Sequence, residues 1–111
     1  MIFKAGGIDN AMSLLTTQFD ADNVLPIELD VQDRSALESA AEQIEAHFGK
    51  VHVLCINAGI GAGGPLHTFS PELWERVISI NLTSVFNGIQ VFVSRMLKHG
   101  EGGHIVSTAS M

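Results

Sequence analysis

Short runs of β-forming residues alternate with longer runs of helical periodicity along this chain, with no linker, repeat or low-complexity tract between them. Strands are expected at residues 2–5, 24–29, 51–56 and 104–108. The third run is almost wholly apolar, which is typical of a parallel strand covered by helices on both faces. Right-handed crossovers would join such strands. The sequence therefore predicts an α/β fold, with a parallel sheet of about four strands and helices on both faces.

Polar residues mark where two of the helices are expected to begin. Asp9 is expected to cap a helix that continues to Phe19, and Asp33 a helix that Gly49 ends. The second helix also carries the pattern Ser-x-x-Glu at residues 35–38, which is typical of a capping box.

The longest helix is expected over residues 71–98, with Ser70 as its cap, Pro71 in its first turn and Gly100 after its end. At 1.5 Å per residue such a helix is ~42 Å long, more than the width of a domain of this mass. A bend or a protrusion is therefore expected near Asn81. Polar residues interrupt the apolar stretch of this helix, so no membrane span is expected.

Length and composition restrict the class of protein. A chain of 111 residues fits one domain, and a net charge of −6 offers no basic surface for nucleic acid. The single cysteine, Cys55, excludes an internal disulfide and a cysteine-based zinc site. Within an apolar strand it is expected to be a small core residue. The N-terminus does not resemble a signal peptide, so a cytoplasmic location is expected.

Three polar residues each follow an expected strand. They are Asp30, Asn57 and Ser110. Because parallel strands end at the same edge of a sheet, these side chains are expected to share one rim, where α/β proteins bind ligands. The alternative is that Asp and Asn end strands because they form turns well.

The glycine-rich run at residues 59–64 matches the pattern G-x-G-x-x-G. In a dinucleotide site the last glycine lies in the first turn of a helix, whereas here the next helix is expected to begin only at Ser70. No acidic residue lies at the end of a second strand about 20 residues on. The run is therefore interpreted as a rim loop and not as a phosphate cradle.

No metal site is expected from the spacing of the five histidines. No two of them are four residues apart on a helix, and His52 and Cys55 would lie on opposite faces of one strand. His99, at the expected end of the long helix, suits a structural role there. Within that helix the amides of Asn81 and Asn87 need partners. One of them is functional, or both face solvent or the neighbouring loop.

Four short motifs in register resemble the short-chain dehydrogenase/reductase family. They are Leu-Asp-Val at 29–31, Val-Leu-Cys-Ile-Asn-Ala-Gly at 53–59, Ile-Asn-Leu at 80–82 and Gly-His-Ile-Val-Ser-Thr-Ala-Ser at 103–110. The resemblance implies that residues 1–111 are a single partial NAD(P)-binding domain, with a Rossmann-like, doubly wound sheet. The family's first strand and C-terminal strands would be missing. That first strand would lie between the strands at Ile2 and Val51.

The resemblance assigns cofactor-binding roles to five residues. Asp30 and the backbone of Val31 match the pair that touches the adenine ring. Asn57, Ala58 and Gly59 match the family's element that steadies the central strands and lets the cofactor lie close, although Ile56 stands where a first asparagine is usual. The choice between NAD and NADP stays open, because the position that decides it reads Gly6-Gly7.

The resemblance also assigns catalytic roles to Asn81 and Ser110. Asn81 matches the asparagine that holds a water in the proton relay, and Ser110 the serine that hydrogen-bonds the alcohol or carbonyl substrate. The family's Tyr-x-x-x-Lys pair and its glycine-rich first turn are absent, and the chain has no tyrosine. The 111 residues alone are therefore expected to be inactive.

Three hypotheses about function follow. The first is an NAD(P)-dependent oxidoreductase, present here as an incomplete chain. The second is a non-catalytic interaction module that forms homo-oligomers through the helix 71–98, which is apolar on more than one face. The third is a flavodoxin-like receiver domain, which would need an acidic pair after its first strand and a lysine after its last, and the sequence has neither.

Overall fold

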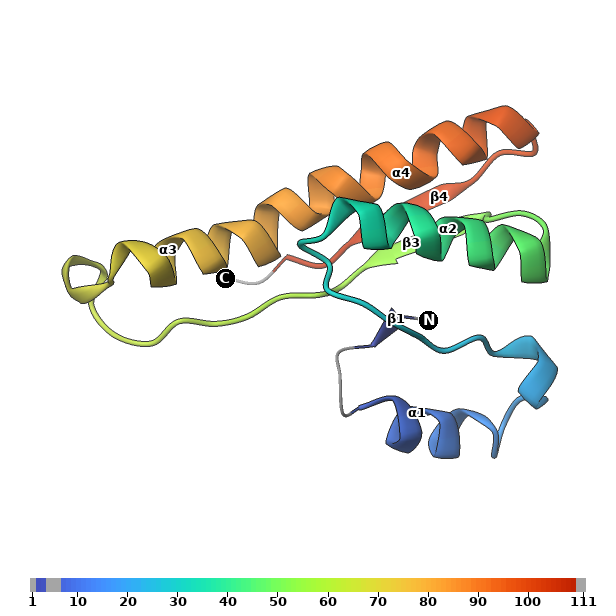
Figure 1. Cartoon of the computed structure of the whole chain (residues 1–111), viewed down its shortest axis with the longest axis horizontal. Coiled ribbons are helices and arrows are strands. Elements are labelled where there is room, and N and C mark those ends of the chain that lie inside the picture. The colour runs from blue at the N-terminus through green and yellow to red at the C-terminus, as the bar shows by residue number, and fades with distance from the viewer. Residues whose placement is uncertain (1, 4–6, 110–111) are drawn as a thin grey trace.

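A computed structural model describes residues 2–3 and 7–109 (Figure 1). In chain order the elements are β1 (Ile2–Phe3), α1 (Ile8–Leu15), η1 (Ala21–Asn23), β2 (Ile27–Glu28), α2 (Arg34–Phe48), β3 (Val53–Ile56), η2 (Leu66–Thr68), α3 (Pro71–Ile78), η3 (Ser79–Thr83), α4 (Ser84–His99) and β4 (His104–Ser107). The predicted alternation of strands and helices is confirmed.

The strands are parallel, as predicted, but in the described residues they form two sheets instead of one. β1 pairs only with β2, and β3 pairs with β4 in a register that sets Val53 opposite His104. The predicted α/β fold with four parallel strands is confirmed, but the four strands are divided between two sheets where one was expected. The break separates the first strand pair from the second, and the resemblance places the family's first strand between these pairs. Without a strand there, no described ladder of hydrogen bonds joins the two sheets.

The core lies between α2, α4 and one face of β3. Leu37 and Ala41 of α2 pack with Val91 and Phe92 of α4, and Leu54 of β3 packs against this cluster. Because side chains alternate along a strand, the neighbours of Leu54 point away from the helices.

The opposite face of β3 is not covered by any described element. Val53 is 56% exposed and Cys55 is exposed. The expectations that helices cover both faces of this strand and that Cys55 is a core residue are therefore wrong. An apolar run shows that a strand can be buried on both faces, but a second covering layer must be present to bury it.

The cap of α2 forms as predicted at Asp33, whose carboxylate accepts a hydrogen bond from the Ala36 N–H (3.1 Å). Gly49 ends the helix with a φ of 88°, a conformation that favours glycine. The capping box does not form, because α2 begins at Arg34 and the serine at position 35 already lies inside it. Glu38 instead pairs with Arg34 at 3.2 Å.

The predicted limits of α1 are wrong at both ends. Gly7 precedes the helix, and Asp9 lies within its first turn instead of capping it. The helix ends at Leu15 and does not reach Phe19. The Thr17 hydroxyl donates to the Leu14 carbonyl (2.6 Å), which occupies an acceptor that a further helical turn would need.

The strands are shorter than predicted. Pro26 has no N–H to donate to a ladder, and β2 begins only at Ile27. β3 lacks the first two residues of the predicted run, and β4 ends one residue earlier, at Ser107. Of the first predicted strand, residues 4 and 5 lie outside the described residues.

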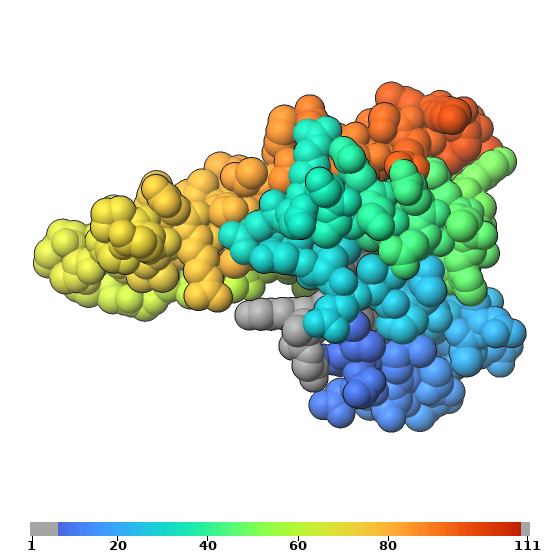
Figure 2. Space-filling view, in the orientation of Figure 1, coloured from blue at the N-terminus to red at the C-terminus, as the bar shows by residue number. Residues whose placement is uncertain are grey.

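The long helix is continuous from α3 through η3 to α4. The Ser70 hydroxyl accepts a hydrogen bond from the Leu73 N–H (3.1 Å), and Gly100 ends the helix with a φ of 70°, both as predicted. The η3 turn is π-helical and contains Asn81. α3 and the preceding loop project from the rest of the structure (Figures 1 and 2), and the structure with this projection measures 47 × 33 × 25 Å. The predicted protrusion is confirmed, and the irregular turn coincides with Asn81.

The helix from Pro71 to His99 is long and apolar enough to cross a membrane, by length and composition alone. Its most apolar window has a mean hydropathy of 1.4, and 28% of that window is buried in the structure. The core helix of a soluble protein meets the same criteria, so these properties are weak evidence for a membrane span.

Candidate functional site

The side-chain amide of Asn81 holds the glycine-rich loop in place. Its Oδ1 accepts a hydrogen bond from the Ile60 N–H, and its Nδ2 donates to the Ile60 carbonyl, each at 2.8 Å. Of the alternatives left open by the sequence, Asn81 therefore faces the neighbouring loop. The other helix asparagine, Asn87, is 8% exposed and so does not face solvent.

Gly59 packs closely against the same amide. A Cβ atom at this position would lie 3.4 Å from Asn81 Oδ1. Asn57, Ala58 and Gly59 are all exposed. The loop is thus fixed from one side by Asn81, while its other surface is open to a ligand.

The carboxylate of Asp30 is engaged in its own turn. Its Oδ1 accepts from the Gln32 backbone N–H (2.9 Å), and both of its oxygens lie 3.1 Å from Gln32 Nε2. Asp30 is exposed and Val31 is half-buried. The turn-forming interpretation of Asp30 therefore describes the geometry seen here. A ligand amine would have to replace the side-chain amide of Gln32, which is half-buried.

Two of the segments next to the candidate rim contact α4. Gly88 lies against Ile56 at the end of β3, and Arg34 at the start of α2 bonds to Gln90 through its guanidinium. The end of β3 and the start of α2, which follows β2, thus both contact α4 within a single turn of that helix. The Thr108 N–H donates to the Ile56 carbonyl (3.0 Å), so the chain leaves β3 and β4 at the same edge.

Ser110, which also follows β4, lies outside the described residues. The structure therefore places Asn57, Ala58, Gly59 and Asn81 together, and it holds the segment after Asp30 on the same helix.

The glycine-rich run does not open a helix. Residues 61–65 have no regular structure, η2 follows, and α3 begins only at Pro71. The predicted rim loop is confirmed, because no helix N-terminus directly follows the glycines as a phosphate cradle requires.

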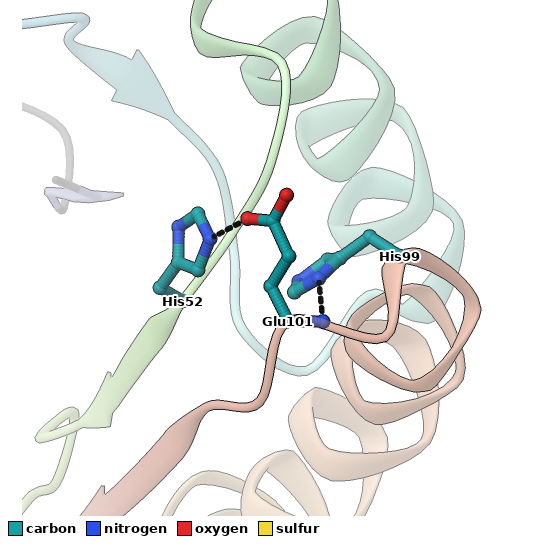
Figure 3. A group of neighbouring side chains, drawn as sticks. All are labelled: His52, His99 and Glu101. Atoms are coloured by element: carbon teal, nitrogen blue, oxygen red, sulfur yellow. Dashed lines mark hydrogen bonds and ion pairs between the residues drawn. The ribbon is translucent and has the colours of Figure 1, made fainter.

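A second cluster of polar side chains lies at the opposite end of the β3–β4 pair, where both strands begin (Figure 3). His52 Nε2 lies 2.8 Å from Glu101 Oε2, and the Glu101 backbone N–H donates to His99 Nδ1 at 3.1 Å. His99 Nε2 lies 2.8 Å from the Val51 carbonyl, and Lys50 forms an ion pair with Glu101.

Hydrogen bonds from Lys50 and His52 lower the pKa of Glu101 to about 2, and the positive charge of Lys50 acts in the same direction. Glu101 is therefore an anion at neutral pH. Sequence reasoning missed this cluster, because His52 and Glu101 are 49 residues apart and no local pattern connects them.

Comparisons with known proteins agree on one family. The model described as short chain dehydrogenase matches residues 5–111. The chain is 39% identical to 2-dehydro-3-deoxy-L-rhamnonate dehydrogenase (NAD(+)) of a Sphingomonas species, over 92% of this chain and 41% of that protein. It is 40% identical to C alpha-dehydrogenase of a Sphingobium species, over 77% of this chain and 28% of that protein.

Solved structures show the same fold. A short-chain dehydrogenase/reductase from Burkholderia phymatum, in complex with NAD, superposes with a TM-score of 0.89 at 33% identity. The match covers 98% of this chain and 39% of that one. The chain spans less than half the length of the curated relatives it matches, from 14% to 41%.

Proposed function

This chain belongs to the short-chain dehydrogenase family, and we propose that it forms the cofactor- and substrate-facing rim of an NAD(P)-dependent oxidoreductase. The reaction would be hydride transfer between a nicotinamide and an alcohol or carbonyl substrate. The observation that carries the proposal is the loop after β3, which the Asn81 amide holds with one surface open at the edge where β3 and β4 end.

The described residues fit a dinucleotide in two respects. Ala58 and Gly59 are small and exposed, so a cofactor can approach their backbone closely. Asp30 offers a carboxylate that can accept from the exocyclic amine of an adenine once Gln32 moves aside, and Val31 offers its backbone beside it. The bound nicotinamide would supply or accept the hydride. The choice between NAD and NADP stays open.

Asn81 has the hydrogen-bonding capacity for two tasks. One lone pair of its Oδ1 and one hydrogen of its Nδ2 are used on Ile60, which leaves one of each for a water molecule. We infer that Asn81 is a positioning residue that holds both the loop and a water of the proton relay. Ser110 is proposed to donate a hydrogen bond to the substrate oxygen, which polarises the C–O bond.

The test transplants this chain into a relative of known activity. In a chimaera, the chain replaces the matching stretch of the Sphingomonas 2-dehydro-3-deoxy-L-rhamnonate dehydrogenase, which it matches over 103 residues. The host then supplies the Tyr-x-x-x-Lys pair that this chain lacks. We expect NAD-dependent oxidation of the host's substrate, followed by the absorbance of NADH. A chimaera with a folded circular dichroism spectrum and no turnover above the uncatalysed rate would contradict the proposal.

A second candidate function is self-association through the long helix. Large apolar side chains form an exposed stripe at helical spacing, with Leu82 62%, Phe86 56%, Ile89 38% and Leu97 76% exposed. Their positions, at i, i+4, i+7 and i+15, lie on one side of the helix and away from its buried side at Val91 and Phe92. We propose that a second copy of this chain covers the stripe, because a contiguous exposed apolar surface of this kind is typical of a protein–protein interface.

The expected result is a dimer in light scattering at micromolar concentration. Phe86→Asp would place a charge in the middle of the stripe and is expected to shift the protein to the monomer, because an unpaired charge in an apolar interface is costly. Glu72→Gln, a change on the exposed surface of α3, serves as the control and should leave the dimer intact. A wild-type chain that is strictly monomeric at these concentrations would contradict the self-association hypothesis.

A further inference from the structure

The cluster of His52, His99 and Glu101 carries an inference that is independent of the oxidoreductase activity. The three side chains each offer one ligand atom, and these atoms lie within 4.8 Å of one another (Figure 3). They come from three segments: the residue before β3, the C-terminus of α4 and the turn before β4. We propose that they bind a divalent transition-metal ion, for which zinc is the best match.

The chemistry of the three ligands favours zinc. Two imidazole nitrogens and one carboxylate oxygen are a donor set that zinc binds with tetrahedral geometry, with a fourth position left for water. Hard cations such as Mg²⁺ or Ca²⁺ prefer sites made only of oxygen ligands. The two histidines therefore select against those ions.

His99 already has the outer contact that a metal-binding histidine needs. Its Nε2 lies 2.8 Å from the Val51 carbonyl, which can only accept, so Nε2 carries the hydrogen and Nδ1 carries the lone pair. A hydrogen bond from the second ring nitrogen to a backbone carbonyl fixes the tautomer and orientation of metal-ligating histidines. His99 is half-buried, so its ring is the fixed ligand of the three.

The other two ligands are free to close around an ion. The side chains of His52 and Glu101 are 51% and 48% exposed, so rotating them disturbs no core packing. Ligand atoms around one tetrahedral zinc lie about 3.3 Å apart, so the cluster must contract on binding. The bond from the Glu101 N–H to His99 Nδ1 must also be given up.

Lys50 is the group that competes with the metal. Its ammonium pairs with Glu101 and supplies positive charge where the ion would sit. An ion that binds both histidines as well as the carboxylate would displace this lysine. Removing the lysine charge should therefore strengthen metal binding, whereas a lysine that only supports the fold would have no such effect.

The test is a titration of the 111-residue chain with Co²⁺, whose visible absorption reports a four- or five-coordinate site, followed by displacement with Zn²⁺. We expect saturation at one ion per chain. His52→Ala and Glu101→Gln, both changes at exposed side chains, should each weaken Co²⁺ binding at least tenfold. Lys50→Gln should tighten it severalfold. His67→Ala, which removes an exposed histidine from η2, is the matched control and should change nothing.

Two results would overturn the proposal. One is the absence of saturable Co²⁺ uptake by the wild-type chain at micromolar concentration. The other is uptake that persists at wild-type affinity in both His52→Ala and Glu101→Gln, which would locate the ion elsewhere. Thermal unfolding gives a second readout: Zn²⁺ should raise the midpoint of the wild-type chain and leave that of His52→Ala unchanged.

Discussion

Replacing Phe92 by alanine is expected to lower the free energy of unfolding by about 3–5 kcal/mol. Phe92 is 2% exposed and packs in the cluster that joins α2 to α4. Removing the ring forfeits the favourable free energy of its transfer from water into the core, and it leaves a cavity between the two helices. A small domain is stabilised by only about 5–15 kcal/mol in total, so the substitution is expected to remove a fifth or more of the free energy of unfolding.

Urea denaturation followed by far-UV circular dichroism measures this effect. The matched control is Phe19→Ala, which removes the same ring from a side chain that is 54% exposed. Its free energy of unfolding should stay within about 0.5 kcal/mol of the wild-type value. Equal stabilities for the two variants would show that α2 and α4 are not packed together as the structure describes.

Replacing Ser110 by alanine in the active chimaera is expected to lower kcat by about a hundredfold or more. The proposed role of this hydroxyl is to donate a hydrogen bond to the substrate oxygen, and that bond strengthens as charge develops in the transition state. A lost donor of this kind affects kcat, while the KM for the cofactor stays near its original value. Ser110→Thr, which keeps the hydroxyl, should recover part of the turnover.

The control for this prediction is Ser94→Ala in the same chimaera. Among the described residues, the Ser94 hydroxyl bonds to carbonyls of its own helix, at 3.3 Å, so its loss should leave kcat within twofold of the starting value, about 0.4 kcal/mol. Steady-state rates over a range of substrate and NAD concentrations separate the two parameters. Undiminished turnover in Ser110→Ala would remove Ser110 from the mechanism.

Sequence reasoning succeeded where neighbouring residues decide the structure. Asp33 and Ser70 cap their helices because the acceptor and the N–H that it satisfies are three residues apart. Gly49 and Gly100 end helices because their positive φ values suit glycine. The same reasoning failed for Asp9, since one carboxylate can suit either a cap or a first helical turn and only the position of the helix start distinguishes the two.

The site was predictable in part. Four motifs in register indicated the family, and the family model, the relatives and the solved structures agree with it. The roles of Asp30, Val31, Asn57, Ala58, Gly59, Asn81 and Ser110 stay predictions that the proposed experiments address. The two hydrogen bonds between Asn81 and Ile60 could not be derived from the sequence, because several loop paths satisfy an amide equally well.

The sequence by itself determined the order of strands and helices, the caps at Asp33 and Ser70, and the family, because these depend on residues within a few positions of one another. Only the tertiary structure decided that the strands form two separate pairs, that Cys55 is exposed and that His52 meets His99 and Glu101. Each of these depends on which distant segments pack together. Distant segments pack together so that apolar surfaces are removed from water and backbone N–H and C=O groups find partners. Local sequence patterns do not show which segments will do so.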